Sequence, residues 1–225
     1  TISADPLMNL KLMAHVATVR SSRSTTDPET VTAALVMLGI SPFFRAFGPQ
    51  TAVDQHLGGH PEALQGFNRV LRRAHRSAAF ALAFAVHRMD HDAPVIHAAA
   101  LLHDFAEMLL WLHAPALALQ IAERQRRDPT LRSAQVQREL LHIELQDLQQ
   151  ALMRAWRLPE LLVQINDERH AETAQVRNVL LAVRLARHTA RGWDNAALPD
   201  DVRDIAALLT LGEVPTLQLL RDIDR

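Results

Sequence analysis

The segment VIHAAALLHDFAEMLLW, residues 95–111, is the most informative part of this sequence. Its apolar residues recur with helical spacing, so the pattern predicts a buried helix from Val95 to Trp111. His103 and Asp104 stand side by side in the middle of this apolar run, although adjacent helix positions point about 100° apart. Both are ordinary ligands of first-row metals, and a buried charge needs a partner to offset its desolvation. The pair therefore indicates either a metal site or an internal polar network.

The rest of the chain also has helical periodicity. Asp5-Pro6 predicts the start of a first helix, and residues 27–29 (Asp-Pro-Glu) predict the start of a second, which Gly39 ends. A long pattern runs from about 61 to 89, and residues 133–156 hold two further helices. No alternating strand run or hairpin signal is found. The sequence therefore predicts an all-α fold.

Composition narrows the class of protein. With 225 residues, 48% hydrophobic and 22% charged, the chain is long enough for one globular domain with a sizeable core. The formal net charge of −1 gives no general reason to bind nucleic acid or an anionic membrane. The absence of cysteine excludes disulfides and thiolate metal sites.

His, Arg or Asp interrupts each apolar run before it reaches the length of a membrane span, and no signal peptide is visible. We therefore expect a cytoplasmic protein, and the start at Thr1 without Met suggests a piece of a longer one.

Among the twelve histidines, His75 is the second candidate for chemistry. It lies in RRAHRSAAFALAFA (residues 72–85), on a helix that we expect to pack against the one bearing His103 and Asp104. His87 and His91 are spaced i,i+4 beside acidic residues at a helix end, which favours surface pairing over metal binding. His75, His103 and Asp104 therefore form the candidate metal-ligating set.

These segments, taken in order, resemble the HDOD family. That family is the HD-related output domain of bacterial signalling proteins, a branch of the HD superfamily of metal-dependent phosphohydrolases. The resemblance covers essentially the whole chain. It rests on five segments: DPLMNLKLMAHVATV (5–19), TVTAALVMLG (30–39), RAHRSAAFA (73–81), AALLHDFAEMLL (99–110) and QRELLHIELQDLQQALMRAWRLPELL (137–162). The Asn-Ser pair that usually follows the apolar stripe of the first segment is absent. The resemblance implies an HD-like helical bundle with an N-terminal helical lobe. We expect a single domain, with this lobe in residues 1–60, an HD core in 61–191 and C-terminal helices in 192–225.

The resemblance also implies a ligand set, and this chain departs from it. His75, His103 and Asp104 stand where the family's histidine and HD pair are expected. The distal aspartate is expected within LLAVRLARHTA (residues 180–190), where this chain has Ala186-Arg187. Leu145 stands where binuclear relatives place a further histidine. Arg169-His170 stands where a paired histidine is expected.

Of these departures from the ligand set, the arginine at position 187 has the largest consequence for metal binding. Replacing a carboxylate by a guanidinium alters the local charge by two units beside a would-be divalent cation. At about 4–6 Å and an effective dielectric constant near 20, each unit contributes a few kcal/mol. We expect Arg187 to occupy the place of the metal and to pair with Asp104 through a bidentate fork. His75, His103 and Asp104 would then be a vestigial, unoccupied set without a cofactor.

Three hypotheses of function follow. The first is a non-catalytic signal-transduction domain that acts through a protein partner, a linked domain or a bound ligand. Trp111, Trp156 and Trp193 are candidate anchors for a partner, and the sequence leaves open whether the chain forms a homodimer.

The second hypothesis is a metal-dependent phosphohydrolase acting on nucleotides or cyclic dinucleotides, motivated by His75 and the HD pair. The third is a nucleic-acid-binding module with two basic faces: Arg69, Arg72, Arg73 and Arg76, and Arg124, Arg126 and Arg127. At this net charge solvated helix surface is the simpler explanation of both faces. We favour the first hypothesis, with neither a membrane nor nucleic acid as partner.

Overall fold

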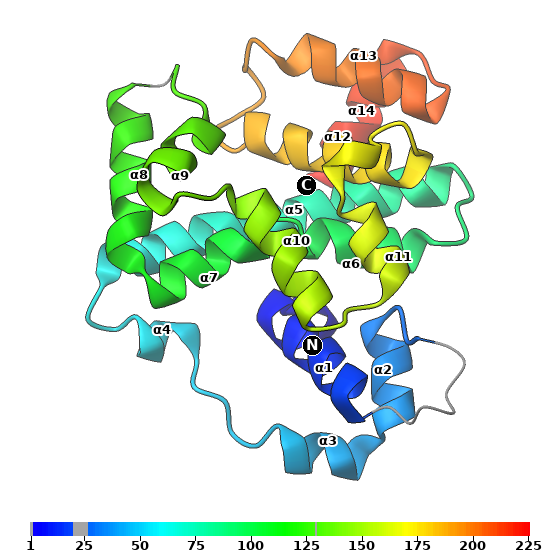
Figure 1. The fold of residues 1–225 in the computed structure, drawn as a ribbon. Helices are drawn as coiled ribbons and strands as arrows, with labels where there is room; N and C mark the ends of the chain where they lie inside the picture. The colour runs from blue at the N-terminus through cyan, green and yellow to red at the C-terminus, as the bar shows by residue number, and fades with distance from the viewer. Residues whose placement is uncertain (1, 20–26, 129) are drawn as a thin grey trace.

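The computed structural model describes residues 2–19, 27–128 and 130–225. Every regular element in these ranges is a helix, so the predicted all-α class is confirmed (Figure 1). In chain order the elements are η1 (Ile2–Ala4), α1 (Pro6–Val19), α2 (Val31–Leu38), α3 (Ile40–Ala46), α4 (Val53–His56), α5 (Pro61–His87), α6 (Ala93–Leu102), α7 (Phe105–His113), α8 (Pro115–Arg127), α9 (Ser133–Leu141), α10 (Leu145–Ala155), α11 (Glu160–Ile165), η2 (Glu168–His170), α12 (Ala174–His188), α13 (Leu198–Leu209) and α14 (Glu213–Ile223).

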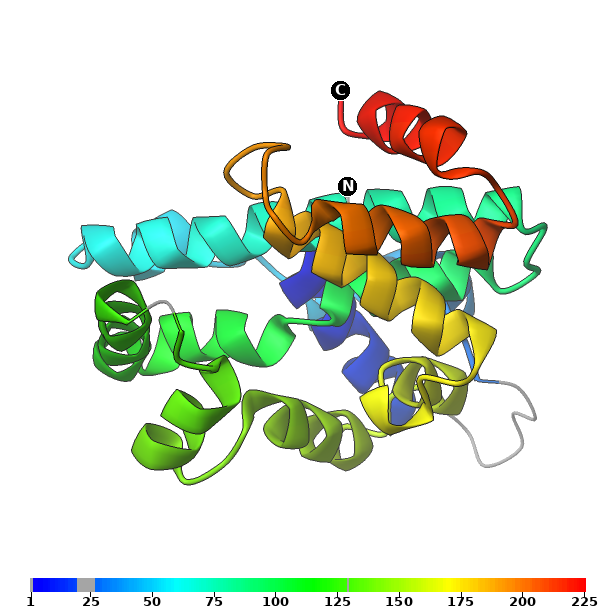
Figure 2. The same cartoon turned by 90° about the horizontal axis from the view of Figure 1, so that it is seen from above.

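The long helix α5 organises the core. Its buried residues Phe67, Val70, Ala74, Ala81 and Phe84 recur three, four or seven positions apart, which places them on one side of the helix. That side packs against α6 and α12. Helices α13 and α14 lie beyond α12, α1 to α3 lie on the opposite side of the molecule, and α8 and α9 lie at one end (Figures 1 and 2). The core is therefore built from helices that are distant in sequence.

Two predicted helix starts have different outcomes. The Asp5 carboxylate accepts hydrogen bonds from the backbone N–H groups of Leu7 and Met8 at 2.9 and 3.0 Å, which confirms the predicted start of α1. The predicted start at 27–29 was wrong. Helix α2 begins at Val31, because the hydroxyl of Thr30 accepts from the backbone N–H of Ala33 and caps the helix. Its end at Gly39, with φ of 82°, is as predicted.

The single helix predicted over 95–111 was also wrong, because it is broken at the HD pair. Helix α6 ends at Leu102 and α7 begins at Phe105. Asp104 has φ of −112° and ψ of 24°, outside helical values, and turns the chain between the two helices. In an unbroken helix the two side chains would diverge by about 100°, whereas here the His103 Nδ1 lies 3.2 Å from an Asp104 oxygen. The break lets both side chains point to one centre.

The combined segment Ala93–His113 is long and apolar enough to cross a membrane by length and composition alone. This corrects the expectation that every apolar run is interrupted before reaching that length. In the structure, 72% of its most apolar window is buried inside the molecule. Burial in the core therefore accounts for the apolar composition of this segment.

Candidate functional site

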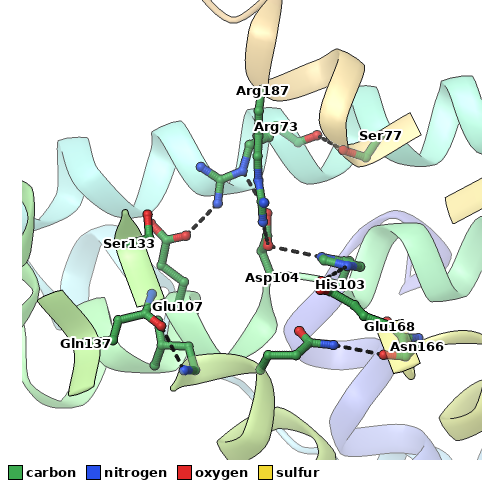
Figure 3. Close-up of polar contacts among 12 residues, drawn as sticks. Arg73, Ser77, His103, Asp104, Glu107, Ser133, Gln137, Asn166, Glu168 and Arg187 are labelled. Carbon is green, nitrogen blue, oxygen red and sulfur yellow. Dashed lines mark hydrogen bonds and ion pairs between the residues drawn. The ribbon is translucent and has the colours of Figure 1, made fainter. Parts of the chain in front are cut away.

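Six charged or ionisable side chains meet where α5, the α6–α7 turn, η2 and α12 come together. We call this group the HD cluster; Figure 3 shows it in close-up. Its members are Arg73, His103, Asp104, Glu107, Glu168 and Arg187. Figure 3 shows that both arginine side chains reach the same aspartate, with the imidazole beside it.

Asp104 is the centre of the HD cluster. Its side chain is 9% exposed, and each carboxylate oxygen accepts a hydrogen bond from an arginine. The Nε of Arg73 lies 2.7 Å from Oδ2, and an Nη2 of Arg187 lies 2.7 Å from Oδ1. Burial alone would raise the pKa of Asp104, but the two arginines and His103 hold it well below its usual range. This carboxylate is therefore ionised and neutralised from within the protein.

His103 lies between two carboxylates. It is 3% exposed, with Nδ1 at 3.2 Å from Asp104 Oδ1 and Nε2 at 3.3 Å from Glu168 Oε1. The second contact lacks the angle of a hydrogen bond, so Nε2 is a buried atom with an ion-pair neighbour only. Burial lowers the pKa of His103, but the interactions with Asp104 and Glu168 outweigh it, and the net pKa is raised. The position at the C-terminal end of α6 also favours a positive imidazolium.

Glu107 and Glu168 complete the charge balance. The Nη2 of Arg73 donates to Glu107 Oε2 at 2.5 Å, so one guanidinium joins two acidic residues of neighbouring helix turns. The carboxylates of Asp104 and Glu107 raise the pKa of Arg73 further above its usual range, in spite of its burial. His103 lowers the pKa of Glu168. With His103 protonated, three positive and three negative groups offset one another, so the charges of the HD cluster balance without a further ion.

The structure does not bring His75 to the HD cluster, and its place in the predicted ligand set must be corrected. Its Nε2 donates to the backbone carbonyl of Ala4 at 2.7 Å. Residues two positions apart on a helix point about 200° apart. Because Arg73 faces Asp104, His75 faces away from it, toward η1. Of the predicted set only His103 and Asp104 meet.

The predicted pairing of Arg187 with Asp104 is confirmed, but not as a bidentate fork. Arg187 supplies one N–H, because Arg73 already occupies the second carboxylate oxygen. Sequence reasoning had placed Arg73 only in a solvated basic face and had not singled out Glu107 or Glu168. Glu107 could have been found, because it lies three positions after Asp104 and thus on a neighbouring turn. Glu168 carried no signal beyond its place next to Arg169-His170.

The remaining predicted ligand positions also lie outside the HD cluster. His170 is exposed, and its Nδ1 lies 3.4 Å from Glu172. Leu145 is buried at the start of α10.

Among the described residues, no group of three or more His, Asp or Glu side chains could hold a metal ion. A divalent cation at Asp104 would also face two guanidinium groups, and two unit charges of the same sign repel by roughly 4 kcal/mol at 4 Å with an effective dielectric constant near 20. The residues present do not fit the metal that the family's ligand set implies.

The two basic faces weighed as nucleic-acid surfaces are largely neutralised. Arg76 forms two hydrogen bonds to Asp224, at 2.7 and 2.8 Å. Arg124 pairs with Glu139, and Glu123 pairs with both Arg126 and Arg127. Arginines already paired with carboxylates offer little positive charge to phosphates, so these contacts give no support to a nucleic-acid interface.

Comparison with known proteins identifies the family of this chain. The family model of the HDOD domain matches residues 1–172. The chain belongs to the HDOD family. Two solved structures show the same fold at 16% sequence identity. The MmoQ response regulator from Methylococcus capsulatus str. Bath has a TM-score of 0.64, with 92% of this chain and 85% of that one covered. A protein from Shewanella amazonensis SB2B, named as a phosphohydrolase candidate, has a TM-score of 0.53, with 99% and 80% covered. No protein with curated annotation matches this chain in sequence.

Proposed function

We propose that this HDOD chain is a non-catalytic signal-transduction domain in which an ion-pair network replaces the metal of the HD superfamily. One observation carries the proposal: each oxygen of the Asp104 carboxylate accepts a hydrogen bond from an arginine. An HD phosphohydrolase needs this carboxylate for its metal. Family membership and the similarity to the fold of a response regulator support a role in signalling. We expect the domain to act in the cytoplasm on a protein partner or a linked domain.

The proposal is tested by metal content and by the effect of a chelator. Protein expressed in medium rich in Fe, Mn and Zn should purify without a stoichiometric metal. Its melting temperature should not change with EDTA, because no metal contributes to folding. A fall of many degrees with EDTA would contradict the proposal.

The variant Arg187→Asp sharpens the test. It removes one of the two guanidinium groups and adds the acidic residue type that the HD ligand set expects at this position. We expect metal to bind this variant and not the wild type. Arg177→Asp is the matched control, because Arg177 is exposed on the same helix, α12. If the control gained metal equally, the gain would reflect added surface charge and not a reopened site.

A metal-dependent phosphohydrolase is the second candidate, favoured by the buried His103 Nε2 that has no hydrogen bond of good geometry. Such an enzyme would hydrolyse bis-p-nitrophenyl phosphate when Mn²⁺ is added, and it would lose this turnover in His103→Ala. We expect no turnover in the wild type. Turnover that disappears in His103→Ala would replace our proposal with this one.

A further inference from the structure

A separate cavity of about 540 Å³ lies on the other side of α7 from the HD cluster. Residues of α1, α4 and α7, the segment 49–51, and Trp156 directly after α10 contribute to its lining; these helices are labelled in Figure 1. Its volume is that of a small-molecule site, since such sites measure roughly 300–1,000 Å³. A folded partner would need a broader surface than this. The cavity is therefore suited to a small molecule.

The body of the cavity is apolar. Leu10 of α1, Leu109 of α7 and Trp156, directly after α10, are among the side chains that line it. The rings of Trp156 and Phe105 pack with centroids 5.8 Å apart, which holds the indole in place from behind. A ligand here would bury apolar surface against a preformed wall.

The polar groups at the cavity are basic or neutral. Of the described residues that line it, none is acidic, whereas Lys11, His56 and His113 all contribute. Lys11 is the only lysine of the sequence. Its Nζ donates to the neutral amide oxygen of Gln50 at 2.8 Å, and no carboxylate among the described residues forms an ion pair with it. This positive charge is therefore left for a ligand.

Two histidines also line the cavity. The Nε2 of His56 lies 3.2 Å from the backbone carbonyl of Leu112, and because a carbonyl only accepts, this nitrogen carries the hydrogen. In the neutral ring the Nδ1 of His56 is then a hydrogen-bond acceptor. The His113 ring meets that of His56 edge to face, with centroids 6.1 Å apart.

From this lining we infer that the cavity binds a small amphiphilic carboxylate, with its apolar chain against Leu10, Leu109 and Trp156 and its carboxylate beside Lys11. An anionic group would pair with Lys11, which has no carboxylate partner among the described residues, and none of the described lining residues is acidic. The apolar chain is required by the rest of the wall. This inference does not depend on the HD cluster, so it can fail without affecting the proposed function.

The test compares dodecanoate with dodecan-1-ol and dodecyltrimethylammonium, all below their micellar concentrations, on the whole chain. Binding is followed by tryptophan emission, since Trp156 lines the cavity, and by calorimetry. We expect dodecanoate to bind more tightly than either of the others. Lys11→Met should weaken dodecanoate by about fivefold, the size of a partly screened ion pair, and should leave dodecan-1-ol unchanged. Arg154→Met, an exposed arginine on α10, is the matched control and should have no effect.

A second variant fixes the location. Ala14→Phe places a ring in the cavity and should abolish dodecanoate binding, while Ala151→Phe, on the exposed face of α10, should not. Far-UV circular dichroism establishes that both variants fold. Equal binding of all three probes, binding that survives Ala14→Phe in a folded protein, or no binding of dodecanoate would each overturn the inference. Should Ala14→Phe not fold, the response to Lys11→Met still decides.

Discussion

The HD cluster and the cavity lie on opposite sides of α7 and treat charge in opposite ways. In the HD cluster, three acidic side chains, two arginines and a histidine are paired with one another around the buried His103 and Asp104. At the cavity, Lys11 donates to a neutral amide and has no carboxylate partner among the described residues, and much of the wall is apolar. A charge that is desolvated on folding must find its partner inside the protein, whereas a charge at an open cavity is hydrated until a ligand arrives. On the proposals made above, the HD cluster would contribute to stability, and a ligand would bind at the cavity instead.

The largest loss of stability is expected for Asp104→Ala, which removes the carboxylate at the centre of the HD cluster. The substitution leaves Arg73 and Arg187 directed at the same place without their carboxylate. We expect the free energy of unfolding to fall by about 3–5 kcal/mol, the usual cost of removing one partner from a buried ion pair. Urea denaturation measures it. Glu107→Ala is the control and should cost about 1 kcal/mol, because Glu107 is 33% exposed and is not the only partner of Arg73. Equal losses in the two variants would mean that Asp104 is not the centre of the cluster.

A second prediction concerns α7, which joins the two regions. A Cβ added at Gly66 of α5 would come within 2.5 Å of the ring of Trp111, and Trp111 is 4% exposed, so the ring has little room to move. We expect Gly66→Ala to destabilise the protein by about 1–2 kcal/mol in spite of the higher helix propensity of alanine. Thermal unfolding followed by circular dichroism measures this. At Gly59 an added Cβ would meet nothing within 4 Å, so Gly59→Ala is the matched control and should be nearly neutral. A neutral Gly66→Ala would show that α5 and α7 are not in close contact.

The pH dependence of stability separates two histidines of the α6 region. Burial and the nearby His75 lower the pKa of His97, so the unfolded state binds a proton more readily, and acidification through about pH 6.5 destabilises the fold. The pKa of His103 is raised, so its contribution is fully present below about pH 6.5 and is lost as the pH rises through the higher, folded value. Between pH 7.5 and 5.5, His97→Gln should therefore lose less stability than the wild type, and His103→Gln should lose more. Urea midpoints across this range measure both, and shifts of the same sign would contradict the assignment.

The smallest effect is expected at the cavity. Lys11 is exposed and makes one hydrogen bond to a neutral side chain, so Lys11→Met should change the free energy of unfolding by less than about 0.5 kcal/mol. Urea denaturation of this variant and of Asp104→Ala compares their free energies of unfolding and so tests the contrast between the two regions. A loss as large as that of Asp104→Ala would show that the lysine is part of the structural core and not a group held ready for a ligand.

The all-α class and the family could be predicted without any knowledge of the tertiary structure. Helical periodicity is a local property, and caps such as Asp5 at α1 act within one turn, so both can be read without tertiary contacts. The order and spacing of the five segments carried the family in the same way. The pairing of Arg187 with Asp104 was also predicted, since it needed only the substitution of a guanidinium at one family position.

Only the tertiary structure decided which side chains meet. Arg73 and His75 are two residues apart on one helix, and which of them faces Asp104 depends on the rotation of α5 against α6 and α12, which no local pattern sets. Glu168 reaches His103 because η2 is held near the α6–α7 turn by packing between distant segments. The break of the helix at His103 and Asp104 has the same origin: its cost in helical hydrogen bonds is offset by ion pairs to residues on other helices. Interactions between residues far apart in sequence depend on the relative placement of whole helices, and that placement is fixed by the packed core.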